Sequence, residues 1–509
     1  MPPRIAKSFI LPFFLLSLAL LPFFRYHSNP DAAAYLRIAA YYQHGELTQA
    51  VNGVWSPLIC WLLVPFYAIG LPWMLAFRLL NTLIACGSLY VFGRIIDNFF
   101  TDLSRLARNC LLVGAASQFL IIHFDLITPD LLALFLVLCL LHELLAGNFY
   151  THPLRTGLLG ACMYLAKAYC FYFFLGVIGI YTLFYWAKRG WGLKELPFKA
   201  LFLMGAIFIL VSGLWVAALH HKYGAWELSS APAYNYGVLD ANGGVHHPYD
   251  VTPRLLPLPY PEAYCLWEDP QAVFHLSGSI RDKHLLSVVG SNLKRLYKMG
   301  WYFYIGSLLL LPFLIYGIIR NNKASPGWFS RRYTMVIGYS CLYISGYLLI
   351  FVEGRYVWMV LFTLLLVLYK CIDQVRAWWT SRIARLLPLF LTAFLLLTDV
   401  YFIATHLFVE KQENADIGQL AEAIPPGSHF ATWKTMDLWS PGYLYDWHHY
   451  GGLQSYADWN ALQPDLRTYQ VNYIIIKEPG FLQQMPQDIV AHMVLLKTAG
   501  DIRLYSIRW

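Results

Sequence analysis

Long apolar blocks separated by short polar stretches dominate the pattern of this sequence. Most blocks are about 20 residues long, the length of helix that crosses the roughly 30 Å hydrocarbon core of a bilayer. We therefore predict an all-α polytopic membrane protein with eleven spanning helices. They lie near 8–24, 72–96, 107–123, 128–147, 154–169, 170–187, 198–220, 300–319, 333–352, 355–372 and 386–408. We expect a turn at Lys167–Cys170 between the fifth helix and the sixth.

Three longer polar regions interrupt or follow these helices, namely residues 25–71, 221–299 and the tail 409–509. In the first region, Ala32–His44 predicts a helix. Leu58–Ala68 is apolar but too short to span, so we interpret it as a helix at the membrane interface. The second region is rich in Pro, Gly, Tyr and His, which predicts irregular structure with short helices.

The tail has a different pattern from the rest of the chain. A helix pattern near Asp416–Ala423 precedes a Pro-Pro-Gly turn, and short apolar runs typical of strands follow. The runs lie at His429–Trp433, Val471–Lys477 and Arg503–Ile507. We predict a small α/β domain over 409–509, after a helical membrane domain over 1–408.

Composition and charge fit this organisation. Apolar residues make up 58% of the 509 positions and charged residues 13%, roughly half the charged share of an ordinary soluble domain. Much of the net charge of +8 lies in alternate short loops, so it orients the chain in a membrane and does not indicate a nucleic-acid partner. The positive-inside rule predicts a cytoplasmic N-terminus and an outer C-terminus.

Two acids at predicted helix starts are candidate catalytic groups. Asp31 follows Pro30 before the helix of the first outer region, and Asp130 follows Pro129 at the start of the fourth span. Each could cap its helix, because a carboxylate accepts hydrogen bonds from the free N–H groups there. Each could also face a polar substrate at the outer surface, with Asp31 as a general base. Both interpretations stay open.

Three cations occupy unusual places for lone charges. Lys167 lies in an apolar stretch at the predicted outer leaflet, where it either snorkels to water or meets an anion such as a lipid phosphate. Arg355 either pairs locally with Glu353 or recognises phosphate through its forked guanidinium. Arg78 lies inside the second span and needs an anionic partner, for which Asp31 is a candidate.

Polar and aromatic neighbours add further candidates. His123 and Asp125 precede Asp130 at the same outer junction, where they could hydrogen-bond to a polar substrate. The Trp55-Ser56-Pro57 segment is either a turn at the membrane surface or an aromatic wall for a sugar.

Metal and disulfide sites have little support. The nine cysteines contain no C-x-x-C motif, and the adjacent His pairs lack the spacing of metal ligands. No cofactor is predicted, although a divalent metal held by Asp31 with His246 or His247 stays open.

Taken in this order, the candidate residues resemble those of the GT-C superfamily of membrane glycosyltransferases. The most similar branch is the protein O-mannosyltransferase and lipid A aminoarabinose transferase group, and the resemblance covers about residues 1–400. It rests on Asp31 with Tyr35, Trp55-Ser56-Pro57-Leu58, Phe77-Arg78-Leu79, Thr128-Pro129-Asp130, Gly157–Lys167 and Arg355-Tyr356.

The resemblance implies transfer of a sugar from a polyprenyl-phosphate donor, among membrane lipids, to a glycan, lipid or protein acceptor. It also implies a bacterial inner membrane, with the active face outside the cytoplasm. Many members have a second acid directly after the first, whereas this chain has Ala32 there, so Asp125, Asp130 or Glu46 would have to substitute. The implied roles are catalytic for Asp31 and Asp130, donor phosphate binding for Lys167, Arg355, Tyr356 and Arg78, and substrate binding for Tyr35, Trp55, Asp125 and His123.

Two other classes of function stay open. A transporter or flippase for a lipid-linked substrate commonly shows repeated halves and broken helices near the midplane, and we find no internal repeat. A non-enzymatic membrane assembly protein would not require Lys167 or Arg355 at lipid depth.

Overall fold

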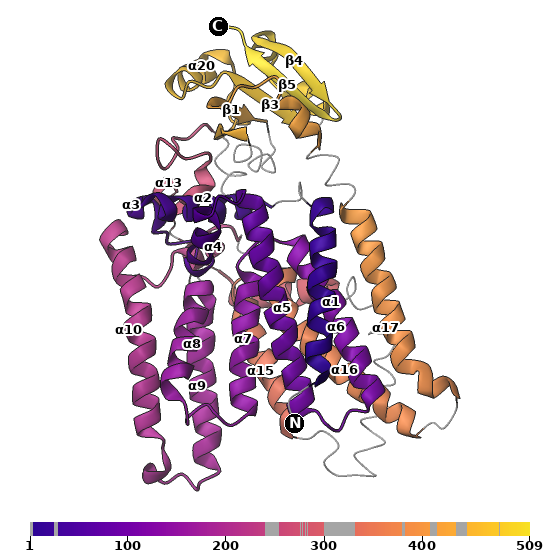
Figure 1. Cartoon of the computed structure of the whole chain (residues 1–509). Helices are drawn as coiled ribbons and strands as arrows, with labels where there is room; N and C mark the ends of the chain where they lie inside the picture. Colours follow the sequence, from indigo (N-terminus) through magenta and orange to yellow (C-terminus); the bar gives the residue numbers. More distant parts are fainter. Residues whose placement is uncertain are drawn as a thin grey trace.

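The computed structural model describes residues 4–24, 29–239, 254–299 except 275, 277, 280 and 282, 331–378, 382–407, 415–433, 445–477 and 479–509. A bundle of long helices carries a layer of short helices at one end, and a small sheet lies beyond that layer (Figure 1). We call the end of the bundle next to this layer the sheet end. The first helix begins at the far end, and the chain finishes in the sheet.

Helices of the bundle lie at ten of the eleven predicted spans, and the span near 300–319 falls outside the described residues. Six of the described helices are long and apolar enough to cross a membrane, so the predicted total of eleven is not confirmed. The bundle helices are α1 (Arg4–Leu20), α5 (Trp73–Phe99), α6 (Arg105–Asp125), α7 (Asp130–Leu145), α8 (Pro153–Ala166), α9 (Tyr169–Ala187), α10 (Phe198–Tyr223), α15 (Arg331–Leu348), α16 (Trp358–Trp378) and α17 (Arg382–Phe402).

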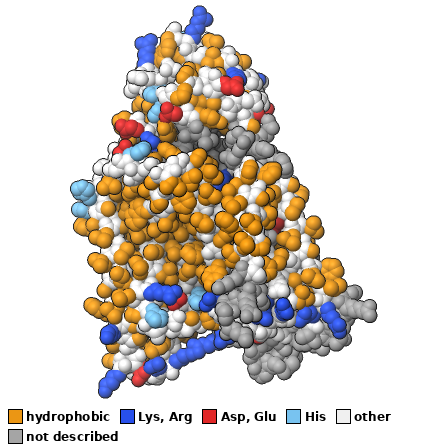
Figure 2. Space-filling view, viewed as in Figure 1, with side chains coloured by type: hydrophobic (Ala, Val, Ile, Leu, Met, Phe, Trp, Pro, Cys, Tyr) orange, Lys and Arg blue, Asp and Glu red, His pale blue; other side chains and the backbone are white. Residues whose placement is uncertain are grey.

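Side chains on the visible face of the molecule separate into zones. Figure 2 shows an apolar band across the middle of the bundle, with Lys and Arg side chains along the end that lies away from the sheet. Large apolar side chains such as Leu214 and Phe202 of α10 are mostly exposed, at 68% and 73%. A helix that exposes such residues on its outer face is suited to lipid.

Two glycines allow close packing around α8. A Cβ atom at Gly157 would collide with the Met204 carbonyl of α10, and one at Gly160 would collide with the Phe174 ring of α9. Only a residue without a Cβ permits this approach. The packing holds α8 close to both neighbours. The predicted break at its sheet end is confirmed, because α8 ends at Ala166 and α9 begins at Tyr169.

The layer of short helices contains both helices predicted in the first polar region. Helix α2 (Pro30–His44) begins with Pro30, whose fixed φ suits the first helical position, and ends at Gly45 with φ +77°. Helix α4 (Leu58–Ala68) is the predicted short apolar helix. Between them lies α3 (Leu47–Ala50), and the second polar region adds α11 (Ala231–Gly237), η3 (Leu266–Glu268) and α13 (Pro270–Val273).

The sheet confirms the small α/β unit expected in the tail. Its strand order is β2-β1-β3-β5-β4, with β1 parallel to β2 and β3, and β5 antiparallel to β3 and β4. The sequence predicts β1, β3 and β5 but not β2 and β4. The elements are β1 (Ser428–Thr432), β2 (Trp447–Gly452), α20 (Trp459–Thr468), β3 (Tyr473–Lys477), α21 (Gln487–Ala491), β4 (Met493–Ala499) and β5 (Ile502–Ile507).

A segment of the second polar region joins the sheet to the short-helix layer. The His449 N–H of β2 donates to the Tyr264 carbonyl at 2.7 Å, and the Leu256 N–H donates to the Tyr450 carbonyl at 3.0 Å. The segment therefore lies along the edge strand β2 and leads directly into η3.

Candidate active site

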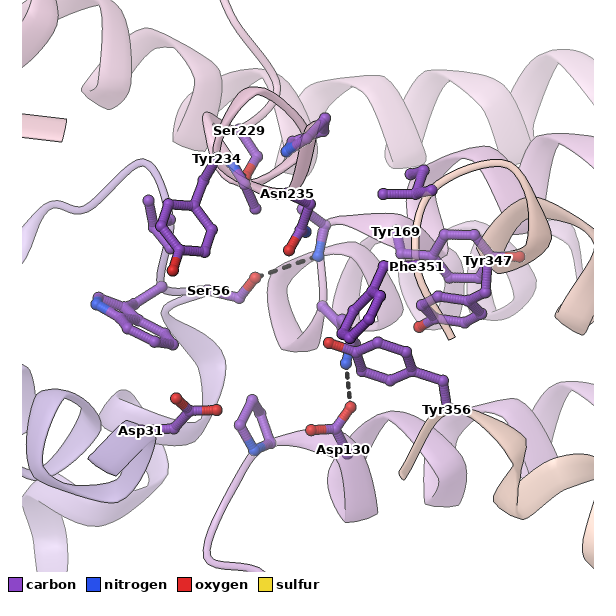
Figure 3. Close-up of a pocket in the computed structure, with 18 of the residues that line it drawn as sticks. Asp31, Ser56, Asp130, Tyr169, Ser229, Tyr234, Asn235, Tyr347, Phe351 and Tyr356 are labelled. Atoms are coloured by element: carbon purple, nitrogen blue, oxygen red, sulfur yellow. Dashed lines mark hydrogen bonds and ion pairs between the residues drawn. The ribbon is translucent and has the colours of Figure 1, made fainter. Parts of the chain in front are cut away.

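A pocket of about 470 Å³ lies at the sheet end of the bundle, between the long helices and the short-helix layer. Its walls come from α2, the turn before α4, the start of α7, the α8–α9 break, α11, η3 and the segment after α15. Figure 3 shows the lining side chains of these separate elements around one space. Charged and aromatic side chains line it together.

The charged lining residues include Asp31, Asp130, Lys167, Glu353 and Arg355, which we call the pocket cluster. Arg355 contacts Asp31 through Nη1 and Glu353 through Nε, the latter at 2.6 Å, and its Nε lies 3.9 Å from Asp130 Oδ2. Lys167 Nζ pairs with Asp130 Oδ1. The local Arg355–Glu353 pair, one of the two alternatives for Arg355, is therefore present, but Arg355 also reaches two distant acids.

Neither candidate acid occupies the N-cap position of its helix. The N-cap of α2 is Asn29, whose side-chain oxygen accepts a hydrogen bond from the Ile127 N–H at 3.0 Å, and the N-cap of α7 is Pro129. Asp31 and Asp130 instead lie in the first turns, where the helix dipole favours negative charge. Both line the pocket.

The break between α8 and α9 sets the direction of Lys167. Its backbone is extended, with φ −156° and ψ 119°, and the adjacent Ala168 N–H donates to Ser56 Oγ at 3.2 Å. The lysine is 18% exposed and its Nζ lies 4.0 Å from the centre of the Tyr356 ring. The ammonium therefore faces an acid and an aromatic ring at the pocket, in contrast to the snorkelling alternative.

Stacked tyrosines form a wall beside this lysine. Tyr169 stacks on Tyr347 with ring centres 3.8 Å apart, and Tyr347 stacks on Tyr356 at 4.5 Å. Figure 3 shows the three rings together, from the start of α9, the end of α15 and the segment that follows it. Of the three, only Tyr356 was a candidate from the sequence.

Trp55 and Tyr35 are also among the lining residues. Trp55 packs edge-on against Tyr35 at 5.2 Å and against Trp267 at 5.6 Å, and its Nε1–H donates to the Trp267 carbonyl at 2.8 Å. Tyr234 of α11 packs edge-on against Trp267 at 5.0 Å. Flat apolar faces beside polar groups are suited to pack against a sugar ring.

A second charged group lies outside the described pocket lining and consists of Arg37, Lys222, Glu268 and Asp269, which we call the scaffold cluster. Arg37 Nε lies 3.6 Å from Glu268, and Lys222 Nζ lies 2.7 Å from Asp269. Burial raises the pKa of the Glu268 carboxyl to about 7, although Arg37 and the Tyr41 hydroxyl act in the opposite direction.

No sequence pattern marks Asn292, which fixes the segment that carries Arg355. Asn292 is fully buried, and its amide donates to the carbonyls of Leu348 and Ile350 at 3.0 and 3.2 Å. Its side-chain oxygen accepts the Val352 N–H at 3.2 Å. An isolated Asn in a polar region has no pattern that marks such a role.

Three candidates are not among the described residues that line the pocket, namely Arg78, His123 and Asp125. Arg78 is buried in α5. Asp31, which was the candidate partner of Arg78, has Arg355 as an ion partner. The His123 ring lies in α6, with Nδ1 2.9 Å from the Phe119 carbonyl, and Asp125 ends that helix. Glu46, at the N-cap of α3, is also not in the described lining.

The described residues contain no group of three or more His, Cys, Asp or Glu side chains that could hold a metal ion. His246 and His247, suggested as metal ligands with Asp31, lie outside the described residues. Within the pocket cluster, Lys167 and Arg355 are the ion partners of the acids.

Comparisons with known proteins identify the fold. No protein-family model matches the sequence, and no curated protein matches it. Among solved structures, the chain is similar to ArnT from Cupriavidus metallidurans in the apo state, with 12% identity, a TM-score of 0.57 and 98% of both chains covered. It is also similar to the arabinofuranosyltransferase AftD from Mycobacteria, with 13% identity, a TM-score of 0.50, and 99% of this chain but 40% of that chain covered. The resemblance found in the sequence is thereby confirmed at the level of the fold: this chain has the fold of the GT-C membrane glycosyltransferases.

Proposed function

We propose that this chain is a multi-pass membrane glycosyltransferase that moves a monosaccharide from a polyprenyl-phosphate donor to a glycan, lipid or protein acceptor. The observation that carries the proposal is the convergence of Asp31, Asp130, Lys167 and Arg355 on one pocket, from four separate stretches of sequence. The GT-C fold supports glycosyl transfer as the class of reaction.

The proposed membrane arrangement has eleven spans, a cytoplasmic N-terminus and the pocket on the outer face of a bacterial inner membrane. The Lys and Arg side chains along the far end of the bundle support it (Figure 2), because such residues concentrate in cytoplasmic loops. In this arrangement, residues 1–408 form the catalytic membrane domain and 409–509 form an outer domain.

The proposed reaction is a direct displacement at the anomeric carbon. Asp31 accepts the proton of the acceptor hydroxyl as its oxygen attacks that carbon. The bond from the carbon to the donor phosphate oxygen breaks, and the electron pair stays on the oxygen. Lys167 and Arg355 stabilise the charge that develops there. One displacement inverts the anomeric configuration.

Other pocket residues position these groups. Asp130 contacts Lys167 and so holds the ammonium toward the pocket, while Tyr356 covers it with its ring. Trp55 and Tyr35 give the sugar an apolar face next to Asp31. No step in this scheme requires a cofactor.

A transfer assay tests the proposal. Purified protein in lipid nanodiscs is incubated with polyprenyl-phosphate sugars labelled in the sugar, and with glycan, lipid and peptide acceptors. We expect labelled product from one of them, with loss of product in Lys167→Ala and Arg355→Ala. Lys497→Ala, which removes a pair between β4 and the exposed Glu422, is the matched control and should keep full activity.

A flippase gives a different result in the same preparation. If no donor and acceptor pair yields product, while reconstituted vesicles move the labelled lipid between leaflets, the glycosyltransferase proposal is wrong and the transporter alternative is correct.

A further inference from the structure

The pocket cluster contains three carboxylates and two cations. Each cation already has a carboxylate partner, since Lys167 pairs with Asp130 while Arg355 pairs with Asp31 and Glu353. A donor phosphate that enters the pocket therefore competes with carboxylates for the same cations. One of these acids must give up its cation before the phosphate can bind closely.

Of the three acids, Asp31 and Asp130 are the more firmly held. Asp130 is 5% exposed and contacts Lys167 as well as lying near Arg355. Asp31 is 19% exposed, in the first turn of a helix that Asn29 ties to Ile127, in the loop before α7. Displacing either one would leave a carboxylate in a confined space without its cation, which is costly.

Glu353 is the acid that can leave. Its side chain is 33% exposed, the largest value in the pocket cluster, and it lies in the segment between α15 and η5 (Gly354–Val357). It occupies the N-cap position of η5, yet its side chain makes no capping hydrogen bond. The contact with Arg355 Nε at 2.6 Å can therefore break while the carboxylate turns toward water.

We propose that Glu353 is an internal substitute for the donor phosphate, which holds Arg355 in place until the phosphate displaces it. A carboxylate and a phosphate both offer two oxygens to the fork of a guanidinium, so one can take the place of the other. This inference rests on the proposed function and adds a residue that sets the affinity for the lipid phosphate.

The same exchange acts after the transfer. The donor phosphodiester carries one negative charge, and the polyprenyl monophosphate left behind carries up to about two near neutral pH. The product would therefore hold Arg355 more strongly than the donor does. Return of Glu353 to Arg355 opposes this and assists release of the product, a step that often limits turnover.

Binding of a short-chain polyprenyl monophosphate to the detergent-purified full chain tests the proposal. We expect Glu353→Gln to bind the probe about tenfold more tightly than the wild type, because one competing charge is gone. Glu353→Asp, which keeps the charge, should bind more like the wild type. Glu195→Gln removes the same charge from an exposed pair with Arg189 and should leave the affinity unchanged.

The sign of the change separates this role from a structural one. If Glu353 only fixed the geometry of Arg355, Glu353→Gln would bind the probe with equal or lower affinity, and the proposal is overturned while the proposed function stands. Unfolding temperatures of all variants identify misfolded protein, and Glu353→Ala provides a second test of the sign.

Control ligands distinguish a failure of the role proposed for Glu353 from a failure of the proposed function. Inorganic phosphate and phosphatidylglycerol micelles distinguish a free anion or a general lipid headgroup from the polyprenyl phosphate. If the polyprenyl alcohol binds as well as the monophosphate, or if neither the wild type nor Glu353→Gln binds the monophosphate, both the proposed function and the role of Glu353 are wrong.

Discussion

The pocket cluster and the scaffold cluster lie at the same end of the bundle but differ in the burial and pairing of their charged side chains. In the scaffold cluster, the side chains of Glu268 and Asp269 are 1% and 0% exposed, and tyrosine hydroxyls donate to both carboxylates. In the pocket cluster, Lys167 and Arg355 are each 18% exposed and share an excess of carboxylates. The first cluster is closed, whereas the second opens into a cavity.

This difference indicates that the scaffold cluster stabilises the structure, whereas the pocket cluster is suited to bind a ligand. Buried and fully paired charges hold loops together, since removing one partner leaves the other uncompensated. Asp269 accepts from Lys222, Tyr223 and Tyr260 and so fastens the second polar region to the end of α10. Charges that share partners beside a cavity can exchange one of them for a ligand, as the proposed reaction requires.

The largest expected effect is on catalysis, through the pocket cluster. Asp31→Asn keeps the size of the side chain but removes the proton acceptor, so we expect transfer to fall by about 10²–10⁴-fold. Initial rates with a labelled donor measure the loss, and the unfolding temperature should change little. Glu46→Gln, which changes an acid of the same layer outside the described pocket lining, should keep its activity. Full activity in Asp31→Asn would remove Asp31 from the mechanism.

Substitutions in the scaffold cluster should lower the stability of the protein and not act on the chemical step. Asp269→Ala leaves Lys222 without its carboxylate, and breaking a buried ion pair typically destabilises by about 3 kcal/mol or more. We expect a clear drop in unfolding temperature in detergent. Combining it with Lys222→Met should recover part of the loss, because the lone buried charge is then gone. A stable Asp269→Ala protein with impaired donor binding would mean that the two clusters do not differ in role.

A pH effect sharpens the contrast further. The Glu268 pKa of about 7 lies above its ordinary value of 4.5, so the folded state holds the proton more tightly than the unfolded state. Its contribution to stability is therefore greatest at low pH and falls as the pH rises through about 7, by about 2 kcal/mol. The unfolding temperature of Glu268→Gln should fall less than that of the wild type between pH 5.5 and 8. Parallel curves for the two proteins would contradict this.

The sequence predicts the fold well where one segment decides its own structure. Apolar blocks predict the positions of the described bundle helices, and α4 has the predicted bounds because Pro57 and a short apolar run determine it locally. The number and direction of membrane crossings depend on residues outside the described part and on the bilayer. Strands β2 and β4 were missed because neither has a regular alternation, as in the Trp-His-His-Tyr-Gly-Gly run of β2.

The sequence predicts the pocket only in part, for a physical reason. Asp31, Lys167 and Arg355 stand out because charges are rare beside apolar blocks. Arg78 stands out in the same way, yet it lies in α5 and is not in the described lining. Tyr347 and Asn292 carry no such signal, since tyrosines are common in this chain and a buried Asn is recognisable only from the backbone groups that it contacts.

The smallest expected effect concerns Ser56, which belongs to the pocket wall but has a supporting role. Its hydroxyl accepts the Ala168 N–H at 3.2 Å, next to Lys167. Ser56→Ala removes one hydrogen bond, which is worth about 1 kcal/mol, so we expect roughly fivefold weaker binding of polyprenyl monophosphate. Ser56→Thr keeps the hydroxyl and should restore the affinity. If both variants bind as the wild type does, the backbone alone directs Lys167. The hydrogen bond to Ser56 then makes no contribution to phosphate binding.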